Sequence, residues 1–291
     1  MKILDLLQQN TLSISFEVFP PKTESGFDSV RTATEEIAAL RPAFMSVTYG
    51  AGGGTSRYTL DIAKNIKAQY GVPTLAHLTC VSSTRQTVQQ RIADIREAGI
   101  CNVMALRGDI PKGMEDADRS CWDYRYAIDL IRELKTAGDF CIGGACYPEV
   151  HPESRNQAED IHYLKEKVEA GCDFLTTQMF FDNNLLYNFL YKIRQSGIDV
   201  PVIPGIMPIT NGNQVERAIT LSGSLMPQRF KSLVDKFGDD PAAMKQAGIA
   251  YATDQIIDLY ANGITHVHVY SMNKPDVAAK ILNNLSDIIG K

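Results

Sequence analysis

The feature that most constrains the fold is a regular alternation of short apolar runs with longer segments of helical periodicity. Several runs are apolar on both faces, which is typical of strands buried in a parallel sheet. The eight runs are Ser13–Phe19, Ala43–Tyr49, Pro73–Thr79, Cys101–Arg107, Cys141–Tyr147, Asp173–Met179, Val200–Gly205 and Thr265–Tyr270. Strand–helix alternation repeated eight times predicts an α/β fold, a single (β/α)8 TIM barrel that spans residues 1–291 as one domain.

The segments between the runs have the apolar spacing of amphipathic helices. The predicted helices are Ser29–Leu40, Arg57–Gln69, Arg85–Ala98, Tyr124–Thr136, Gln157–Ala170, Leu185–Gln195, Gln214–Leu221, Gln228–Phe237, Ala242–Tyr260 and Asp276–Leu285. The alternative is a doubly wound open sheet, which usually has fewer strands and often a glycine fingerprint after its first strand. Here that position reads Phe19-Pro20-Pro21-Lys22, which favours the barrel.

Composition and charge narrow the class of protein. Hydrophobic residues make up 44% and charged residues 22%, as in ordinary folded proteins, and 29 Lys and Arg against 34 Asp and Glu give a net charge of −5. This sign disfavours binding to nucleic acid or to an anionic membrane. No run approaches the roughly 20 apolar residues of a membrane span, and Asp5 and Gln8 interrupt the N-terminal apolar stretch. We therefore expect a cytoplasmic protein with small-molecule ligands.

The cysteine pattern gives no sign of a metal site. Six cysteines stand at positions 80, 101, 121, 141, 146 and 172, and no two have the spacing Cys-x-x-Cys. Most lie inside apolar runs, which is typical of reduced thiols packed in a core. His266 and His268 alternate along the last strand, and two histidines alone are weak evidence for a metal. We predict no metal ligands.

Polar residues stand at the C-terminal ends of nearly all the predicted strands. They are Glu17, Thr48, Tyr49, His77, Arg107–Asp109, Tyr147–His151, Gln178 and Tyr270. In TIM barrels the active site forms at this rim, so these side chains are expected to converge on a ligand. Taken singly, His77 and Gln178 are equally compatible with core polar residues that have a partner.

Glu17 lies inside the apolar run Ile14–Phe19. Burial there would raise the pKa of its carboxyl group and suit it to act as a general acid. The alternative is a glutamate at the barrel mouth paired with Arg or Lys.

Two loops after predicted strands have the chemistry of a cofactor site. In Arg107-Gly108-Asp109, arginine can clamp a phosphate, glycine admits a close backbone approach, and aspartate can polarise a ring system; a salt-bridged turn is the alternative. In Tyr147–Glu153, two prolines exclude a helical zinc motif, so hydrogen bonding to a cofactor fits better. His151 alone could equally be a loop histidine. Gly50–Gly54 fits neither standard phosphate-loop pattern and is interpreted as a loop that lets backbone approach a ligand.

Together these residues resemble the methylenetetrahydrofolate reductase family. The matching stretches span the chain in order: Ser15–Pro21, Ser46–Ala51, Ala76–Cys80, Ala105–Asp109, Tyr147–Glu153, Thr177–Gln178, Ile203–Pro208 and Tyr270–Asn273. The length resembles the short bacterial form. The resemblance implies a TIM-barrel catalytic domain that binds FAD and reduces 5,10-methylenetetrahydrofolate to 5-methyltetrahydrofolate, with reductant and folate taking turns in one site.

The resemblance also implies roles for single residues. Glu17 matches the general acid that helps open the imidazolidine ring to the 5-iminium cation, and Asp109 matches the aspartate beside flavin and pterin. Gln178, Gln214 and Lys274 match folate contacts, and Thr48 matches a nicotinamide contact. Positions that contact FAD are matched by Tyr49, Ala51, His77, Arg107, Gly108, Ala127, Tyr147, His151, Asp160 and Lys167.

Four positions depart from the family pattern. Ala218 stands where some members have a phenylalanine that stacks on nicotinamide or folate, and Lys274 replaces an arginine near the folate tail. Tyr163 and Glu166 replace an asparagine and an arginine on the FAD side. The first change favours electrons from a redox partner subunit over free NADH, and an oligomer of like or unlike subunits is expected.

Two alternatives stay open at this point. One is another barrel enzyme, such as a metal-independent aldolase or cyclohydrolase, although no predicted strand supplies the lysine that a Schiff-base aldolase needs. The other is a flavin- or folate-binding subunit of a larger electron-transfer complex that has no turnover alone.

Overall fold

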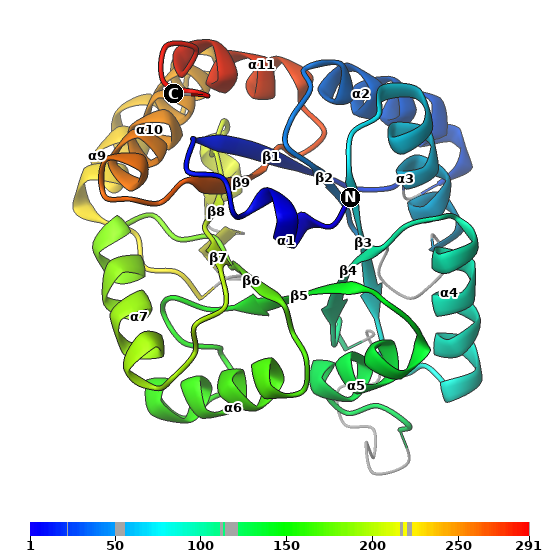
Figure 1. The fold of residues 1–291 in the computed structure, drawn as a ribbon. Helices are drawn as coiled ribbons and strands as arrows, with labels where there is room; N and C mark the ends of the chain where they lie inside the picture. The colour runs from blue at the N-terminus through cyan, green and yellow to red at the C-terminus, as the bar shows by residue number, and fades with distance from the viewer. Residues whose placement is uncertain are drawn as a thin grey trace.

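The computed structural model describes residues 1–21, 23–49, 56–110, 113, 122–215, 218–219 and 223–290. All strand pairs described are parallel and follow the order β7-β6-β5-β4-β3-β2-β1-β9-β8, with helices around them (Figure 1). The strands are β1 (Ser13–Val18), β2 (Met45–Val47), β3 (Thr74–Thr79), β4 (Asn102–Leu106), β5 (Cys141–Cys146), β6 (Phe174–Thr177), β7 (Val202–Ile203), β8 (Gly205–Ile206) and β9 (His266–Tyr270). The predicted (β/α)8 barrel is confirmed.

The barrel has eight strand positions, called staves here, and β7 and β8 together form the seventh. One helix follows each stave. These helices are α2 (Phe27–Ala39), α3 (Ser56–Tyr70), α4 (Arg85–Glu97), α5 (Ala127–Ala137), α6 (Gln157–Glu169), α7 (Asn183–Gln195), α10 (Pro241–Ala261) and α11 (Pro275–Asn284). The long connection after the seventh stave adds α9 (Gln228–Phe237), with the bounds that the sequence predicted. The predicted helix Gln214–Leu221 lies partly outside the described residues. No helix in the described part of the chain is long and apolar enough to cross a membrane.

The seventh stave is broken at Pro204, which divides it into β7 and β8. β7 pairs with β6 on one side, and β8 pairs with β9 on the other, so the two pieces together close the ring. Proline has no N–H to donate to a ladder. The chain instead uses the Gly205 N–H, which donates to the Thr177 hydroxyl at 2.8 Å, and the Pro204 carbonyl, which accepts from His268 N–H.

The outer faces of the strands form the main apolar core. In β1, Ile14, Phe16 and Val18 are buried against the helices, and alternate residues point to the barrel axis. Apolar burial of this kind is the main stabilising term of the fold. It leaves the inward positions free to carry different chemistry.

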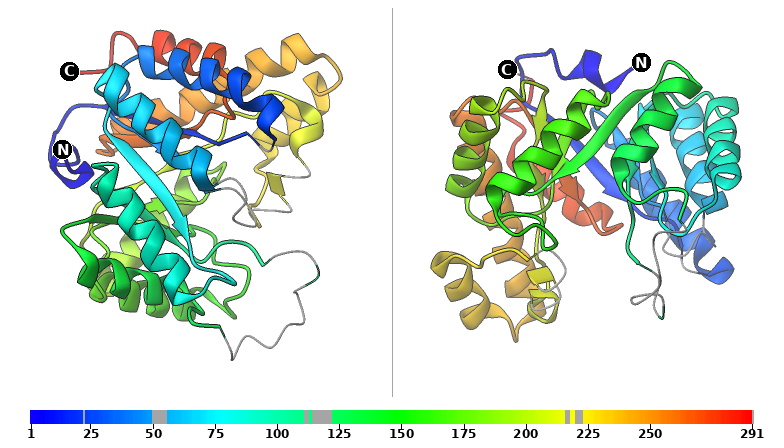
Figure 2. Two further views of the ribbon diagram at one scale, coloured as in Figure 1. Left: turned by 90° about the vertical axis from the view of Figure 1, so that its right-hand side faces the viewer. Right: turned by 90° about the horizontal axis from the view of Figure 1, so that it is seen from below.

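The lower end of the barrel interior, at the N-terminal ends of the strands, is apolar. One buried cluster fills it, made of Ile3, Phe44, Leu75, Met104, Cys141, Phe174 and Ile203. Ile3 comes from α1 (Ile3–Leu6), a short helix that the sequence did not predict. Asn102 fixes α1, because its Oδ1 accepts from Ile3 N–H at 2.9 Å and its Nδ2 donates to the Met1 and Thr74 carbonyls. Figure 2 shows α1 at one end of the barrel and α9 at the other.

The upper end of the interior is polar. The inward positions that follow the apolar layer carry Glu17, Thr48, His77, Thr79, Thr176, Gln178, His268 and Tyr270, and all of these line one pocket. The strands thus change from apolar to polar side chains along their length. The site is therefore positioned by the same strands that build the core.

Candidate active site

A pocket of about 930 Å³ opens at the C-terminal ends of the strands. Most of the predicted site residues line it: Glu17, Thr48, Tyr49, His77, Arg107, Gly108, Asp109, Ala127, Tyr147, His151, Asp160, Lys167 and Gln178. The volume lies near the upper end of the roughly 300–1,000 Å³ found for small-molecule and cofactor sites. Residues far apart in the sequence are therefore brought together as the strand ends predicted.

Glu17 and His77 form a close pair inside this pocket. The carboxylate Oε2 of Glu17 lies 3.8 Å from His77 Nε2, and the two side chains are only 22% and 9% exposed. Burial raises the pKa of Glu17 to about 8 and lowers the pKa of His77 to about 4. At neutral pH the pair is thus a protonated carboxyl beside a neutral imidazole. Among the described residues, no Arg or Lys forms an ion pair with Glu17, which counts against the paired-glutamate alternative.

His268 lies below this pair and is fully hydrogen-bonded. Its Nδ1 and Nε2 lie 2.7 Å and 2.9 Å from the hydroxyls of Ser15 and Ser46. Its ring stacks on Phe44, and burial lowers its pKa to about 3. His266 lies 2.5 Å from the Ser13 hydroxyl. Within the described ranges, no three His, Cys, Asp or Glu side chains gather where they could hold a metal ion.

Arg107 has a carboxylate partner across the pocket. Its guanidinium donates to both oxygens of Glu153 at 2.5 and 2.8 Å, in the bidentate geometry typical of such pairs. The alternative that we weighed for this turn, a salt bridge, is therefore present. The partner Glu153 belongs to the same motif as His151 but was not predicted as a site residue.

Gly108 is required by the backbone at this turn. Its φ of +89° is a conformation that L side chains rarely adopt, and an added Cβ would lie 2.9 Å from Thr79 Cβ and 3.0 Å from Val81. The turn after β4 can therefore pack against the end of β3 only with glycine here. Asp109 follows at the exposed rim of the pocket.

The loop after β5 contains a strained residue and is held together by hydrogen bonds. Val150 has a φ of +98°, which is costly for a β-branched residue. His151 N–H donates to Asp160 at 3.1 Å, and His151 Nδ1 accepts from Glu153 N–H at 3.0 Å. Burial lowers the pKa of His151, and the Tyr147 ring lies edge-on to it at 4.6 Å. The imidazole is therefore held neutral, with its proton on Nε2.

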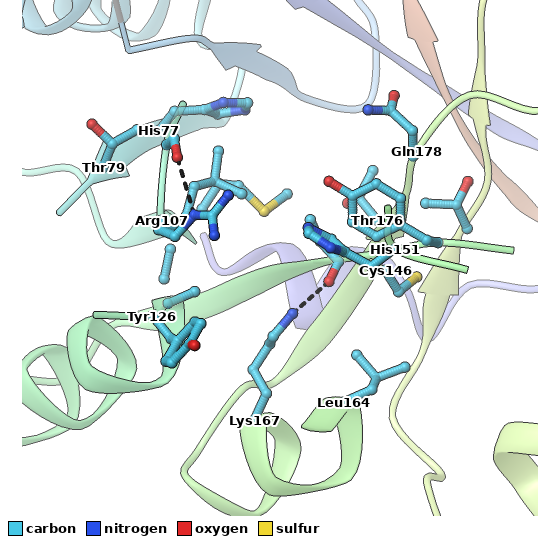
Figure 3. Close-up of a pocket in the computed structure, with 18 of the residues that line it drawn as sticks. His77, Thr79, Arg107, Tyr126, Cys146, His151, Leu164, Lys167, Thr176 and Gln178 are labelled. Atoms are coloured by element: carbon cyan, nitrogen blue, oxygen red, sulfur yellow. Dashed lines mark hydrogen bonds between the residues drawn. The ribbon is translucent and has the colours of Figure 1, made fainter. Parts of the chain in front are cut away.

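Lys167 is half-buried in the wall of the pocket. Its Nζ donates to the Ala145 carbonyl at 2.7 Å (Figure 3). Burial lowers the pKa of the ammonium group. From its helix position alone this lysine reads as a surface charge, so only the family resemblance pointed to the pocket.

Two predicted folate contacts lie elsewhere. Gln214 ends the 3-10 turn Gly212–Gln214, and its Oε1 is buried without a hydrogen-bond partner. Lys274 precedes α11 and donates to the Thr210 hydroxyl at 2.7 Å. Neither lines the pocket, whereas Gln178 does. Ala51 and the Gly50–Gly54 loop lie outside the described residues.

Several lining residues were missed by the sequence analysis. They include Thr79, Met104, Tyr126, Thr176 and Met272. Thr79 and Thr176 stand two residues from His77 and Gln178, so the two-residue period of the strands could have found them. Tyr126 immediately precedes α5 and is 61% exposed at the pocket. Its position before a helix gave no signal of its own.

A pocket of this size at the C-terminal rim of a (β/α)8 barrel, with a largely buried carboxylic acid in it, defines a barrel enzyme of small-molecule chemistry. The family sequence model described as methylenetetrahydrofolate reductase matches residues 2–286. The chain belongs to this family, whose members are oxidoreductases.

Relatives of known name agree with this assignment. The chain is 35% identical over 277 residues to the 5,10-methylenetetrahydrofolate reductase of Pectobacterium carotovorum, covering 95% of this chain and 91% of that protein. It is 35% identical over 295 residues to methylenetetrahydrofolate reductase (NADH) 1 of Arabidopsis thaliana, covering 98% of this chain and 50% of the plant protein. The length is therefore that of the bacterial relative.

Solved structures agree on the fold. An uncharacterized protein from Clostridium thermocellum that binds two copies of 5-methyl-5,6,7,8-tetrahydrofolic acid superposes with a TM-score of 0.68 at 14% identity, over 99% of this chain and all of that one. At such low identity the likeness shows the barrel fold alone.

Proposed function

We propose that this chain reduces 5,10-methylenetetrahydrofolate to 5-methyltetrahydrofolate with FAD as its cofactor. The observation that carries the proposal is the Glu17 carboxyl, which burial keeps protonated at neutral pH at the ligand end of the barrel. Opening the folate's imidazolidine ring needs a proton donor at a ring nitrogen, and a carboxyl with a raised pKa is a suitable donor near pH 7. The names of the relatives support the same reaction.

The described residues fit a flavin dinucleotide. The pocket has the volume, and its lining includes two basic side chains for a diphosphate, Lys167 and Arg107, the second of which would have to share its guanidinium with Glu153. Among the described residues, the buried Thr176 Oγ1 in the pocket lining has no hydrogen-bond partner and is available to a ligand. When bound, FAD supplies the hydride transfer from the reductant to the folate.

The protein residues would supply protons, orientation and exclusion of water. Glu17 would donate a proton to the folate ring nitrogen, and Gln178 would contact the folate ring. Asp109, at the exposed rim, would favour the 5-iminium cation through its negative charge. Gln214 and Lys274 stay predictions as contacts to more distal parts of the folate.

Reductant and folate would use one site in turn, which predicts ping-pong kinetics. The reductant would be NAD(P)H, as the names of the plant relatives indicate for NADH, or a partner redox subunit. Ala218, which is buried, offers no ring to stack on nicotinamide. We therefore propose that a partner supplies electrons at least as well as free NADH does.

The proposal extends to cellular setting and assembly. Described Cys80, Cys101, Cys141, Cys146 and Cys172 are all free thiols, as is usual in a reducing compartment such as the cytoplasm. We propose that residues 1–291 act as one catalytic domain, within an oligomer of like or unlike subunits.

Visible absorbance tests the proposal directly. Freshly purified protein is followed under anaerobic conditions as NADH and then methylenetetrahydrofolate are added. We expect a flavin spectrum that bleaches with the reductant and recovers with the folate. A flavin that ignores NADH but is reoxidised by the folate after chemical reduction identifies a partner as the donor. Protein that cannot be loaded with FAD, or a flavin that the folate never reoxidises, contradicts the proposed reaction.

A further inference from the structure

The Glu17–His77 pair raises a question that a lone general acid leaves open, namely what stabilises the carboxylate once its proton is gone. The pair lies on alternate strands, β1 and β3, at one level of the interior, which is how side chains share a layer in such barrels. In the part of the chain that the structure describes, His77 is the one basic side chain within 4.0 Å of the Glu17 carboxylate. A buried carboxylate without a partner is costly.

Three of the other polar groups that line the pocket are already engaged. From β9, the Tyr270 hydroxyl donates to the Thr177 carbonyl at 2.6 Å, and both ring nitrogens of His268 are taken by serine hydroxyls. From the loop after β4, Arg107 is held by Glu153. Thr48 and Tyr49 after β2, and Cys146 and Tyr147 at the end of β5, carry no cation at neutral pH. None of these groups provides a positive charge for Glu17.

His77 Nε2, in contrast, is buried and has no hydrogen-bond partner among the described residues. The 3.8 Å separation from Glu17 Oε2 is too long for a hydrogen bond, and a closure of about 0.8–1 Å would bring it to the usual 2.7–3.2 Å. Catalytic hydrogen bonds are often long before the ligand binds. A neutral imidazole with its proton on Nε2 can therefore donate to the carboxylate.

We propose that His77 is a positioning residue that makes Glu17 a better acid by donating its Nε2–H to the carboxylate formed when Glu17 gives up its proton. This inference rests on the proposed function of Glu17. The proton passes from the Glu17 carboxyl to a folate ring nitrogen, the imidazole stays neutral throughout, and no electrons move between the two residues. His77 can position Glu17 in this way and still contact the cofactor through its other ring atoms.

Matched variants of His77 separate this role from a structural one. His77→Gln keeps an N–H donor near the position of Nε2. His77→Met introduces a side chain similar in length to that of glutamine but without a donor. Glu17 ionisation is followed in the purified protein by the infrared band of the protonated carboxyl, which Glu17→Gln identifies by its loss. FAD affinity, measured by fluorescence titration, checks that each variant still binds the cofactor.

We expect His77→Met to raise the midpoint of the Glu17 carboxyl band by about one pH unit, and His77→Gln to restore most of it. Reoxidation of the flavin by methylenetetrahydrofolate should slow about three- to tenfold in the Met variant and recover in the Gln variant. An unchanged carboxyl midpoint in His77→Met overturns the inference. If Glu17→Gln itself keeps the folate-dependent step, the proposed acid fails instead, whatever the His77 variants do.

Discussion

The lower and upper halves of the barrel interior are built by the same strands with opposite side-chain chemistry. β6 places Phe174 in the lower half and Thr176 in the upper, and β3 does the same with Leu75 and His77. The outer faces of both halves stay apolar. A step of two residues along a strand therefore separates packing from chemistry. This is why a barrel can change its reaction without changing its fold.

The strongest test of the upper half is Glu17→Gln, which keeps the shape of the side chain and removes its acid proton. We expect the folate-dependent reoxidation of the flavin to slow by about 10²- to 10⁴-fold, the range for loss of a general acid. Stopped-flow absorbance measures this step alone. Flavin content and the rate of chemical reduction serve as controls. A change below threefold would remove Glu17 from the mechanism.

The matching test of the lower half is Phe174→Ala, which removes a fully buried ring from the apolar layer. Truncation of a buried Phe costs about 3–5 kcal/mol of unfolding free energy. Denaturant unfolding measures the loss. The FAD affinity of the folded variant should stay within twofold of the unsubstituted protein. A large loss of affinity would show that the two halves are not separable.

The pH dependence of stability reports the buried titratable groups of the upper half. The folded pKa of Glu17, about 8, lies above the ordinary 4.5, so its stabilising contribution is full below pH 4.5 and is lost as pH rises through 8. His77 and His268, with lowered pKa values of about 4 and 3, act in the opposite direction and only below pH 6.5. Between pH 6.5 and 8 the protein should thus lose about 2 kcal/mol relative to Glu17→Gln. Parallel unfolding curves over that window would contradict the buried acid.

The smallest loss of stability is expected from Asn102, a polar residue that holds α1 at the lower end of the barrel. Asn102→Ala removes the hydrogen bonds that hold α1 and leaves the Ile3 N–H without its side-chain acceptor. We expect a loss of about 1 kcal/mol and faster hydrogen exchange at Ile3. Asn102→Asp, which keeps the acceptor for Ile3 N–H, is the control. Unchanged exchange in Asn102→Ala would show that apolar packing alone fixes α1.

Much of the fold was predictable because strand burial and helix periodicity are local signals. All eight staves and α9 lie where the sequence placed them. The division of the seventh stave at Pro204 and the four-residue helix α1 were missed, since α1 is too short to show a period.

The site was predictable where a polar residue lies near the C-terminal end of a strand, as Glu17, His77 and Gln178 do. Pairings across the pocket were not, because the partner of Arg107 is set by how two loops meet. Gln214 and Lys274 were placed by resemblance and lie on connections beyond the seventh and eighth staves, outside the pocket. Sequence position alone does not fix the path of such connections.

The pairing of β1 with β9 also bears on when Glu17 becomes buried during folding. Ser13–Glu17 align with His266–Tyr270, so the first and last strands of the barrel meet only after the intervening chain has been synthesised. Contacts between such distant segments form late, because closing a long loop is entropically unfavourable. Before β9 docks we expect Glu17 to be an ordinary solvated carboxylate. The burial that raises its pKa in the folded protein is then completed only when the barrel closes.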